Sequence, residues 1–197
     1  MSVLKVENLR KSFGTVKAVE DISFSVEAGE VFTIIGPNGA GKTTTLEMIE
    51  GLQKPDAGTI SINGLNWSKD ESEIKTLIGV QPQSGALFEL LTAEENLDLF
   101  ASFYPRSKET SEVLEMINLT EHRDKRVKSL SGGQRQRLAI GLAMINDPRV
   151  IFLDEPTTGL DPQARRNIWD IIIKLKSLGT TIILTTHYME EAEKLSD

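Results

Sequence analysis

The 197-residue sequence contains no cysteine, so it has no disulfide framework, no thiolate metal site and no cysteine nucleophile. This composition fits a reducing compartment. No apolar run approaches the roughly 18 residues that a membrane-spanning helix needs. The start of the chain alternates polar and apolar side chains, so we expect no signal peptide. Any association with a membrane therefore requires a partner.

Basic side chains are also few. Lysine and arginine number 22 against 29 aspartates and glutamates, which gives a formal net charge of −7. Because phosphate neutralisation dominates nucleic-acid binding, we expect no nucleic-acid partner. The 39% hydrophobic and 26% charged residues are typical of a soluble globular chain, and the length favours a single domain.

Strand and helix patterns alternate near both ends of the chain. Strands are expected at residues 3–9, 22–26, 31–35, 59–62, 77–80, 149–153 and 180–185, and helices at 42–50, 92–103, 109–118, from 131, at 162–178 and from 188. The continuous apolar run at 31–35 predicts a strand buried on both faces. Alternation around a helical middle predicts an α/β fold with a parallel-sheet core.

A glycine-rich segment follows the apolar run at 31–35. It fits the P-loop pattern GxxxxGK[ST] and consists of Gly36, Pro37, Asn38, Gly39, Ala40, Gly41, Lys42 and Thr43, with Thr44 next. Its glycines let backbone N–H groups point into one concavity, and the following helix adds partial positive charge. Lys42 would reach the β- and γ-phosphates of ATP, and the Thr43 hydroxyl would bind Mg²⁺. The plainer alternative is a glycine-rich turn.

Two carboxylates end the apolar strand at 149–153. Standing alone, Asp154 and Glu155 would indicate an acidic start to a helix. Beside a phosphate loop, an aspartate at a strand end is the expected Mg²⁺ ligand. Adjacent strand residues point in opposite directions, so Glu155 is expected to activate the attacking water as a general base.

Further motifs are typical of one family. The segment Leu130-Ser131-Gly132-Gly133-Gln134 resembles the signature motif of ATP-binding cassette proteins, the ATPase subunits of ABC transporters. Gln83 matches the glutamine of the family's Q-loop, and Asp161 matches its D-loop. His187 matches the switch histidine, and Phe13 lies where the family has an aromatic residue that stacks on adenine. The resemblance covers essentially the whole chain.

The resemblance implies a role for three single residues. Gln83 would contact Mg²⁺ and link it to the helical middle, His187 would contact the γ-phosphate, and Phe13 would stack on adenine. Each also has a simpler interpretation. Gln83 and His187 would be ordinary loop residues, and Phe13 would belong to the core.

The resemblance also implies a second subunit, either in a head-to-tail homodimer or as a paired cassette. The residues that would cross this interface toward the partner's ATP are Ser131, Gly132, Gly133, Gln134 and Asp161. Local structure offers an alternative for them. Ser131 and Gln134 have capping-box spacing, and Asp161 before Pro162 is an ordinary helix start.

For the fold, the resemblance implies a P-loop NTPase core with an antiparallel β subdomain near the N-terminus and a helical subdomain. We expect one domain, with residues 1–83 and 147–197 forming the core and residues 84–146 the helical subdomain. Family cassettes usually continue past the switch histidine, so the chain is expected to be C-terminally truncated.

For function, the resemblance implies ATP hydrolysis that powers a membrane permease from the cytoplasmic face of the membrane. The motifs at 78–83 and 91–97 resemble the drug- and antibiotic-efflux branch, which indicates an exporter. Permease docking is expected near an apolar cluster that is equally consistent with core, formed by Leu87, Phe88, Leu90 and Leu91. The alternative is a cassette ATPase of DNA maintenance or translation. The absence of a long coiled coil or a second cassette disfavours it.

Overall fold

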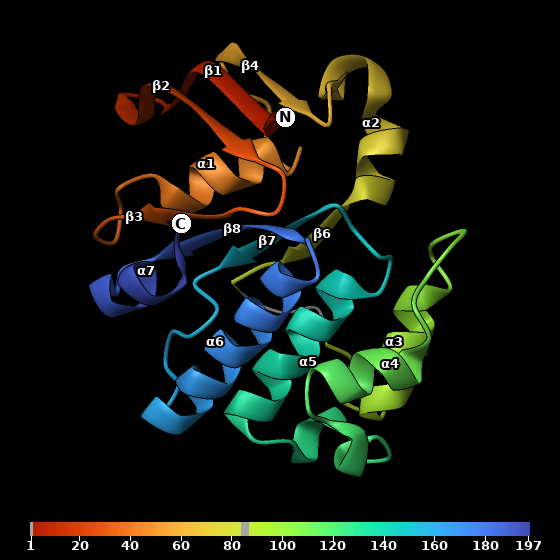
Figure 1. Cartoon of the computed structure of the whole chain (residues 1–197). Helices are drawn as coiled ribbons and strands as arrows, with labels where there is room; N and C mark the ends of the chain where they lie inside the picture. The colour runs from red at the N-terminus through yellow and green to blue at the C-terminus, as the bar shows by residue number, and fades with distance from the viewer. Residues whose placement is uncertain (1, 84–86) are drawn as a thin grey trace.

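The computed structural model describes residues 2–83 and 87–197 and contains two four-stranded sheets (Figure 1). The first sheet has the order β2-β1-β4-β5, and its strands are β1 (Ser2–Phe13), β2 (Val16–Glu27), β4 (Ala57–Ile62) and β5 (Leu65–Asn66). All of its strand pairs are antiparallel. The expected antiparallel β structure near the N-terminus is therefore confirmed.

The second sheet is parallel and has the order β3-β8-β7-β6. Its strands are β3 (Val31–Ile35), β6 (Ile78–Gln81), β7 (Val150–Asp154) and β8 (Thr181–Thr186). Because every pair in it is parallel, the carboxyl ends of β3, β7 and β8 meet at one edge. This is the edge at which open α/β sheets bind their ligands.

One expectation about the parallel sheet is met only in part. Val31 is buried in the apolar cluster on one side of the sheet, and Phe32 and Ile34 pack against the cluster on the other, so both faces of β3 are covered. The strand stands at the end of the strand order, however, and Ile35 remains 44% exposed. β7 and β8 are instead buried along their whole length. A continuous apolar run in the sequence cannot distinguish an edge strand from a central strand of the sheet. Both kinds of strand pack apolar side chains against the helices on either side.

Helix α1 (Lys42–Ile49) lies between the two sheets (Figure 1). It contacts β2 of the antiparallel sheet and β7 and β8 of the parallel sheet. Its buried residues Leu46, Met48 and Ile49 share one apolar cluster with Phe152 and Ile183. Burial of each such side chain contributes about 1.5–3 kcal/mol, so both sheets hold this helix in place directly after the glycine-rich loop.

Three helices cover the other face of the parallel sheet: α5 (Gly132–Met144), α6 (Pro162–Ser177) and α7 (Met189–Leu195) (Figure 1). Farther from the sheet, α3 (Ala93–Ala101) and α4 (Thr110–Met116) pack on α5. The short 3₁₀ helices η1 (Thr120–His122) and η2 (Val127–Ser129) lead from α4 to α5. The all-helical middle of the chain is confirmed. Its division into a subdomain at 84–146 stays a prediction, and residues 84–86 lie outside the described residues.

Helix α3 shows how local sequence determines one of these elements. The Thr92 side chain accepts a hydrogen bond from the Glu95 N–H, and the Glu95 carboxylate accepts one from the Thr92 N–H. This confirms the capping box expected at the start of the helix. The helix ends at Ala101 rather than near Phe103, and Ser102 forms its C-cap.

Helix α2 (Trp67–Leu77) was not expected from the sequence. Ile74 is the only buried residue of α2, and Asp70 interrupts the helical backbone. A helix with so little apolar surface leaves no clear periodicity in the sequence. Within residues 2–83 and 87–197, none of the helices combines the length and the hydropathy that crossing a bilayer requires.

Candidate functional site

The glycine-rich loop joins β3 to α1 and curls tightly at its glycines. Gly39 and Gly41 have φ values of 82° and 84°, in the left-handed region that favours glycine. A Cβ atom on Gly41 would lie 2.2 Å from the Ala18 carbonyl oxygen, so only glycine fits beside β2. The first N–H groups of α1 have no side-chain cap. Curled backbone and an uncapped helix start together form a concavity suited to an anion.

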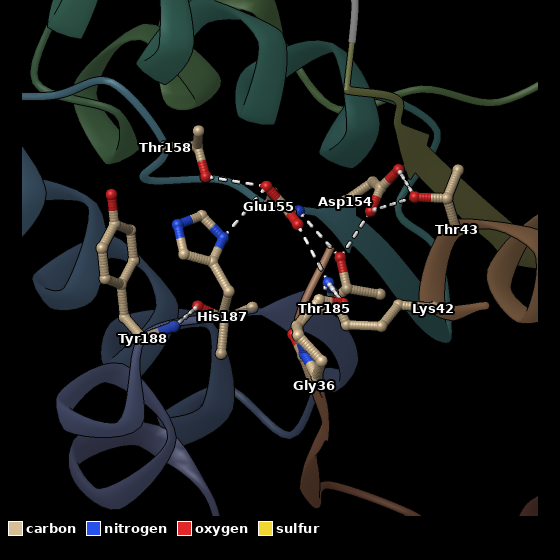
Figure 2. Close-up of polar contacts among 11 residues, drawn as sticks. Gly36, Lys42, Thr43, Asp154, Glu155, Thr158, Thr185, His187 and Tyr188 are labelled. Carbon is tan, nitrogen blue, oxygen red and sulfur yellow. Dashed lines mark hydrogen bonds and ion pairs between the residues drawn. The ribbon is translucent and has the colours of Figure 1, made fainter. Parts of the chain in front are cut away.

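Lys42 crosses this concavity. Its ammonium group donates hydrogen bonds to the carbonyl oxygens of Gly36 and Pro37, at 3.0 and 3.2 Å, and lies 3.3 Å from Oε1 of Glu155 (Figure 2). Only 6% of the side chain is exposed. The loop therefore holds its one cation over the backbone that would surround a bound phosphate.

Asp154, at the end of β7, is fixed by two hydroxyl groups. The Thr43 hydroxyl, from the start of α1, donates to Asp154 Oδ2 at 3.0 Å. The Thr185 hydroxyl, from the neighbouring strand β8, donates to Asp154 Oδ1 (Figure 2). Strand register explains the second contact, because Thr185 is the direct partner of Asp154 in the sheet. Thr185 was not singled out in the sequence.

Glu155 points away from Asp154 because its backbone turns at this residue. Its φ of 46° is unusual for a residue other than glycine, and its N–H donates to the Thr185 hydroxyl at 2.9 Å. The Thr158 hydroxyl donates to Oε2 at 3.0 Å, and Nδ1 of His187 lies 3.3 Å from the same oxygen (Figure 2). The predicted divergence of the two carboxylates is thus present.

These contacts also set the charge of Glu155. Burial acts to raise the pKa of its carboxyl, but the hydrogen bond from Thr158 and the nearby Lys42 and His187 side chains together hold the pKa below its ordinary value. The carboxylate is therefore ionised at neutral pH. An ionised carboxylate beside a phosphate-binding loop can accept a proton from water.

A cavity of about 150 Å³ opens beside α1. Its lining includes all three residues predicted to contact Mg²⁺, namely Thr43, Gln83 and Asp154. A hydroxyl, an amide and a carboxylate supply the hard oxygen ligands that Mg²⁺ prefers, so this donor set fits the ion. Glu50 lines the same cavity, and burial together with the charges of Asp154 and Glu47 raises its pKa to about 8.

The signature segment forms the start of α5. Ser131 is the N-cap, and both hydrogen bonds of the capping box with Gln134 are present, at 2.9 and 3.2 Å. Gly132 has open space where a Cβ would be, whereas a Cβ on Gly133 would lie 2.8 Å from the Cβ of Ala164 in α6. In the described part of the chain, no hydrogen bond or ion pair joins this segment to the phosphate loop.

Two other predicted residues lie at the margins of this arrangement. Asp161 caps α6 by accepting hydrogen bonds from the N–H groups of Gln163 and Ala164, both at 2.9 Å. Phe13, at the end of β1, is 48% exposed, and the Lys11 ammonium lies 5.5 Å from its ring centroid. Its exposure leaves one aromatic face available for stacking.

An aromatic contact next to His187 was also missed. The rings of His187 and Tyr188 have centroids 4.1 Å apart, and the Arg165 guanidinium lies 4.3 Å from the Tyr188 ring centroid. The sequence could have indicated this contact, because Tyr188 directly follows His187 in the chain. Thr185 carried a comparable signal, because it is a polar residue near the end of an apolar strand.

Comparison with known proteins agrees with this geometry. A family model described as "ABC transporter" matches residues 19–158, most of the chain. A second model, of an AAA domain described as a putative AbiEii toxin of a type IV toxin–antitoxin system, matches the shorter stretch 126–191. The first match carries the family assignment because it includes the phosphate loop, the signature and both strand-end carboxylates.

Curated relatives are similar along the whole chain. The linearmycin resistance ATP-binding protein LnrL of Bacillus subtilis (strain 168) is 42% identical over 99% of this chain and 64% of its own length. The Nod factor export ATP-binding protein I of Ralstonia nicotianae is 46% identical over 99% of this chain and 62% of its own. The chain thus spans less than two thirds of the length of these relatives.

Solved structures share the fold. A nucleotide-free ATP-binding cassette from an ABC transporter matches with a TM-score of 0.88 and 28% identity, covering 100% of this chain and 86% of the other. The cassette MJ0796, a dimer in a post-hydrolysis state bound to ADP and phosphate, matches with a TM-score of 0.85 and 31% identity, covering 97% and 90%. With the family model and the curated relatives in agreement, this chain belongs to the ABC transporter family.

Proposed function

We propose that the chain binds and hydrolyses ATP as the nucleotide-binding subunit of an ABC exporter. One observation carries the proposal: five side chains suited to phosphoryl chemistry converge where β3, β7 and β8 end. These are Lys42, Thr43, Asp154, Glu155 and His187. Phosphoryl transfer depends mainly on positioning and electrostatic stabilisation, which such a convergence supplies.

ATP would lie along the phosphate loop. The backbone N–H groups of residues 38–44 would surround its phosphates, and Lys42 would neutralise charge on the β- and γ-phosphates. Phe13 would stack on the adenine through its exposed face. When Mg²⁺ is bound, Thr43, Asp154 and Gln83 would hold it, and the ion would supply charge neutralisation at the phosphate oxygens.

Hydrolysis would use the residues at the ends of β7 and β8. Glu155, ionised and held by Thr158, would orient a water molecule for in-line attack on the γ-phosphate and accept its proton. His187, which lies 3.3 Å from Glu155, would contact the γ-phosphate. Gln83 would transmit the state of the nucleotide to the helical middle of the chain.

The reaction would require two cassettes. Among the residues that the structure describes, no hydrogen bond or ion pair joins the phosphate loop to the signature residues Ser131, Gly132, Gly133 and Gln134 or to the D-loop residue Asp161. We assign them to the ATP of a head-to-tail second copy or paired cassette. Ser131 and Gly132 are exposed, and the helix start they form suits a phosphate. The MJ0796 cassette, which is dimeric with bound ADP and phosphate, supports a pairing of two cassettes.

The partner would be a membrane permease, with the chain bound peripherally at the cytoplasmic face of the membrane. The relatives named for linearmycin resistance and Nod factor export support an exporter over a DNA-maintenance or translation ATPase. Phe88 and Leu90 are 50% and 70% exposed beside α3, which supports docking at this loop, whereas Leu87 packs against the core.

The proposal is tested by nucleotide binding and turnover of the folded chain. Calorimetry with Mg²⁺-ATP should detect binding that Lys42→Ala abolishes, and phosphate release should require Glu155. Folding of each variant is checked by circular dichroism. A folded wild-type chain that takes up no nucleotide would refute the proposal. Co-purification with a co-expressed multi-span membrane protein tests the transporter assignment separately.

A further inference from the structure

Glu50 is a buried carboxylate that the motifs of the chain do not account for. It forms the C-cap of α1, and only 6% of it is exposed. Among the described residues, its Oε1 atom is buried and has no hydrogen-bond partner. It lines the same cavity as Thr43, Gln83 and Asp154.

Local structure does not explain a carboxylate at this position. The carboxyl end of a helix carries partial negative charge, so Glu50 lies where the helix dipole disfavours an anion. A buried carboxylate oxygen without a partner also costs free energy. A small apolar residue would satisfy the packing of α1 without either cost.

The lining of the cavity shows what would compensate this charge. Three carboxylates take part in it, those of Glu47, Glu50 and Asp154, together with a threonine hydroxyl and a glutamine amide. No lysine, arginine or histidine is among the described residues that line it. A cavity of oxygen donors with excess negative charge suits a hard divalent cation.

We propose that Glu50 is an outer ligand of the divalent-cation site, accepting a hydrogen bond from a water molecule bound to the cation. The inference rests on the proposed binding of Mg²⁺-ATP. Thr43 and Glu50 are seven residues apart on α1, so they share a face at about 10 Å along the axis. Because helical side chains tilt toward the start of their helix, we expect the Glu50 side chain to lean toward Thr43, and both residues line the same cavity.

This distance favours contact through water over direct coordination. In addition, no group of three or more acidic or histidine side chains in the described part of the chain converges closely enough to hold a metal ion alone. Outer ligands of this kind orient bound water and typically change metal affinity 10- to 100-fold when removed.

Glu47 provides a matched control on the same helix. It lines the same cavity, but its Oε2 accepts a hydrogen bond from Nε2 of Gln53 at 2.7 Å. Its charge therefore already has a partner, and it is less buried than Glu50. If negative charge near the site is all that matters, Glu47→Gln and Glu50→Gln should weaken metal binding equally. If Glu50 is an outer ligand, only Glu50→Gln should weaken it.

The test measures binding of Mn²⁺ to the chain loaded with a non-hydrolysable ATP analogue, by electron paramagnetic resonance at pH 8. We expect Glu50→Gln to weaken Mn²⁺ affinity about 10-fold or more, and Glu47→Gln to change it less than 2-fold. Binding of the analogue in EDTA should be equal in all three proteins. Glu50→Asp, which retains the charge, should keep part of the affinity and serves as the second variant if Glu50→Gln does not fold.

The outcomes separate this inference from the proposed function. If wild type binds Mn²⁺ with the analogue and the folded Glu50 variants bind it equally well, the role of Glu50 is refuted while ATP binding stands. Equal weakening by Glu47→Gln and Glu50→Gln would likewise overturn it, because net charge alone would then explain the result. If wild type binds neither analogue nor metal, the proposed function itself fails.

Discussion

The ammonium group of Lys42 lies 3.3 Å from Oε1 of Glu155, and both side chains are more than nine-tenths buried. The phosphate-loop cation and the candidate base thus form an ion pair inside the site. Any phosphate that binds Lys42 competes with Glu155 for it. Binding of the nucleotide and the position of the base are therefore linked through one buried charge pair.

The first prediction concerns this pair. Glu155→Gln keeps the shape of the side chain but removes its charge, so Lys42 is held less strongly and becomes more available to phosphate. We expect ATP to bind more tightly to the variant, while turnover falls about 100-fold or more because no carboxylate accepts the proton from water. Calorimetry and a phosphate-release assay measure the two effects.

Glu193→Gln, an exposed glutamate on α7, is the control for loss of one negative charge. It should leave both affinity and turnover unchanged. Near-normal turnover in Glu155→Gln would remove Glu155 from the chemistry. Weaker ATP binding in that variant would show that Glu155 does not compete for Lys42.

A second prediction follows from Thr185, whose hydroxyl links the two strand-end carboxylate residues. Thr185→Val has nearly the same shape, but it removes a donor from Asp154 and leaves the buried N–H of Glu155 without an acceptor. Such a loss costs about 1–3 kcal/mol of unfolding free energy. Turnover should fall roughly 10- to 100-fold, since both carboxylates lose their position.

Urea unfolding and phosphate release measure these changes, with Thr180→Val, just before β8, as the control. That variant should behave like wild type in both assays. A Thr185→Val protein of wild-type stability would contradict the assigned network.

Much of the site was predictable because short motifs encode it locally. The segment from Gly36 to Thr43 requires glycines with positive φ, a strand before it and a helix after it. Each of these features can be predicted from the sequence. The caps at Thr92, Ser131 and Asp161 were predictable for the same reason, since a cap depends on residues three positions apart. Apolar runs located the buried strands β7 and β8.

The rest depends on contacts between distant segments. Thr185 matters because strand register sets it opposite Asp154, and Glu50 matters because α1 and the loop after β6 enclose one cavity. The sequence marks Thr185 only as a polar residue near the end of an apolar strand, and neither contact can be read from a local pattern. The left-handed backbone of Glu155, which separates it from Asp154, is likewise a product of its tertiary contacts. Helix α2 was missed because its surface is mostly polar.

The third prediction uses the raised pKa of Glu50, about 8, against an ordinary value of 4.5. Between these values the folded chain binds more protons than the unfolded chain, so the free energy of unfolding falls as pH rises. The slope is at most about 1.4 kcal/mol per pH unit. Urea unfolding in EDTA between pH 5.5 and 7.5 should show wild type losing stability relative to Glu50→Gln.

Titration of Glu155 does not interfere between pH 5.5 and 7.5, because its pKa is lowered. The free energy of unfolding that Glu155 contributes is lost only in more acidic solution, as pH falls. Glu193→Gln, at an exposed position of α7, is the control and should follow wild type, because Glu193 is not among the groups that raise the pKa of Glu50. Parallel pH profiles for wild type and Glu50→Gln would show that Glu50 is not held in its neutral form by burial.

The fourth prediction separates two adjacent glycines of the signature segment. Alanine at Gly133 would place its Cβ 2.8 Å from the Cβ of Ala164, so α5 and α6 must move apart, at a cost of about 1–3 kcal/mol. Alanine at Gly132 meets open space and should leave stability unchanged or slightly raised. In the proposed dimer, however, the backbone at Gly132 lies against the partner's ATP, and a methyl group there would obstruct closure.

We therefore expect Gly132→Ala, combined with Glu155→Gln, to remain monomeric with Mg²⁺-ATP while the Glu155→Gln parent dimerises, as measured by light scattering after size exclusion. Because Gly132→Ala should be as stable as its parent, loss of the dimer in this variant cannot be attributed to misfolding. Gly133→Ala lowers stability, so loss of the dimer in that variant would have two explanations. If Gly132→Ala dimerises like its parent, the start of α5 does not face the nucleotide of a second subunit. The signature would then be only the helix cap that its hydrogen bonds form within this chain.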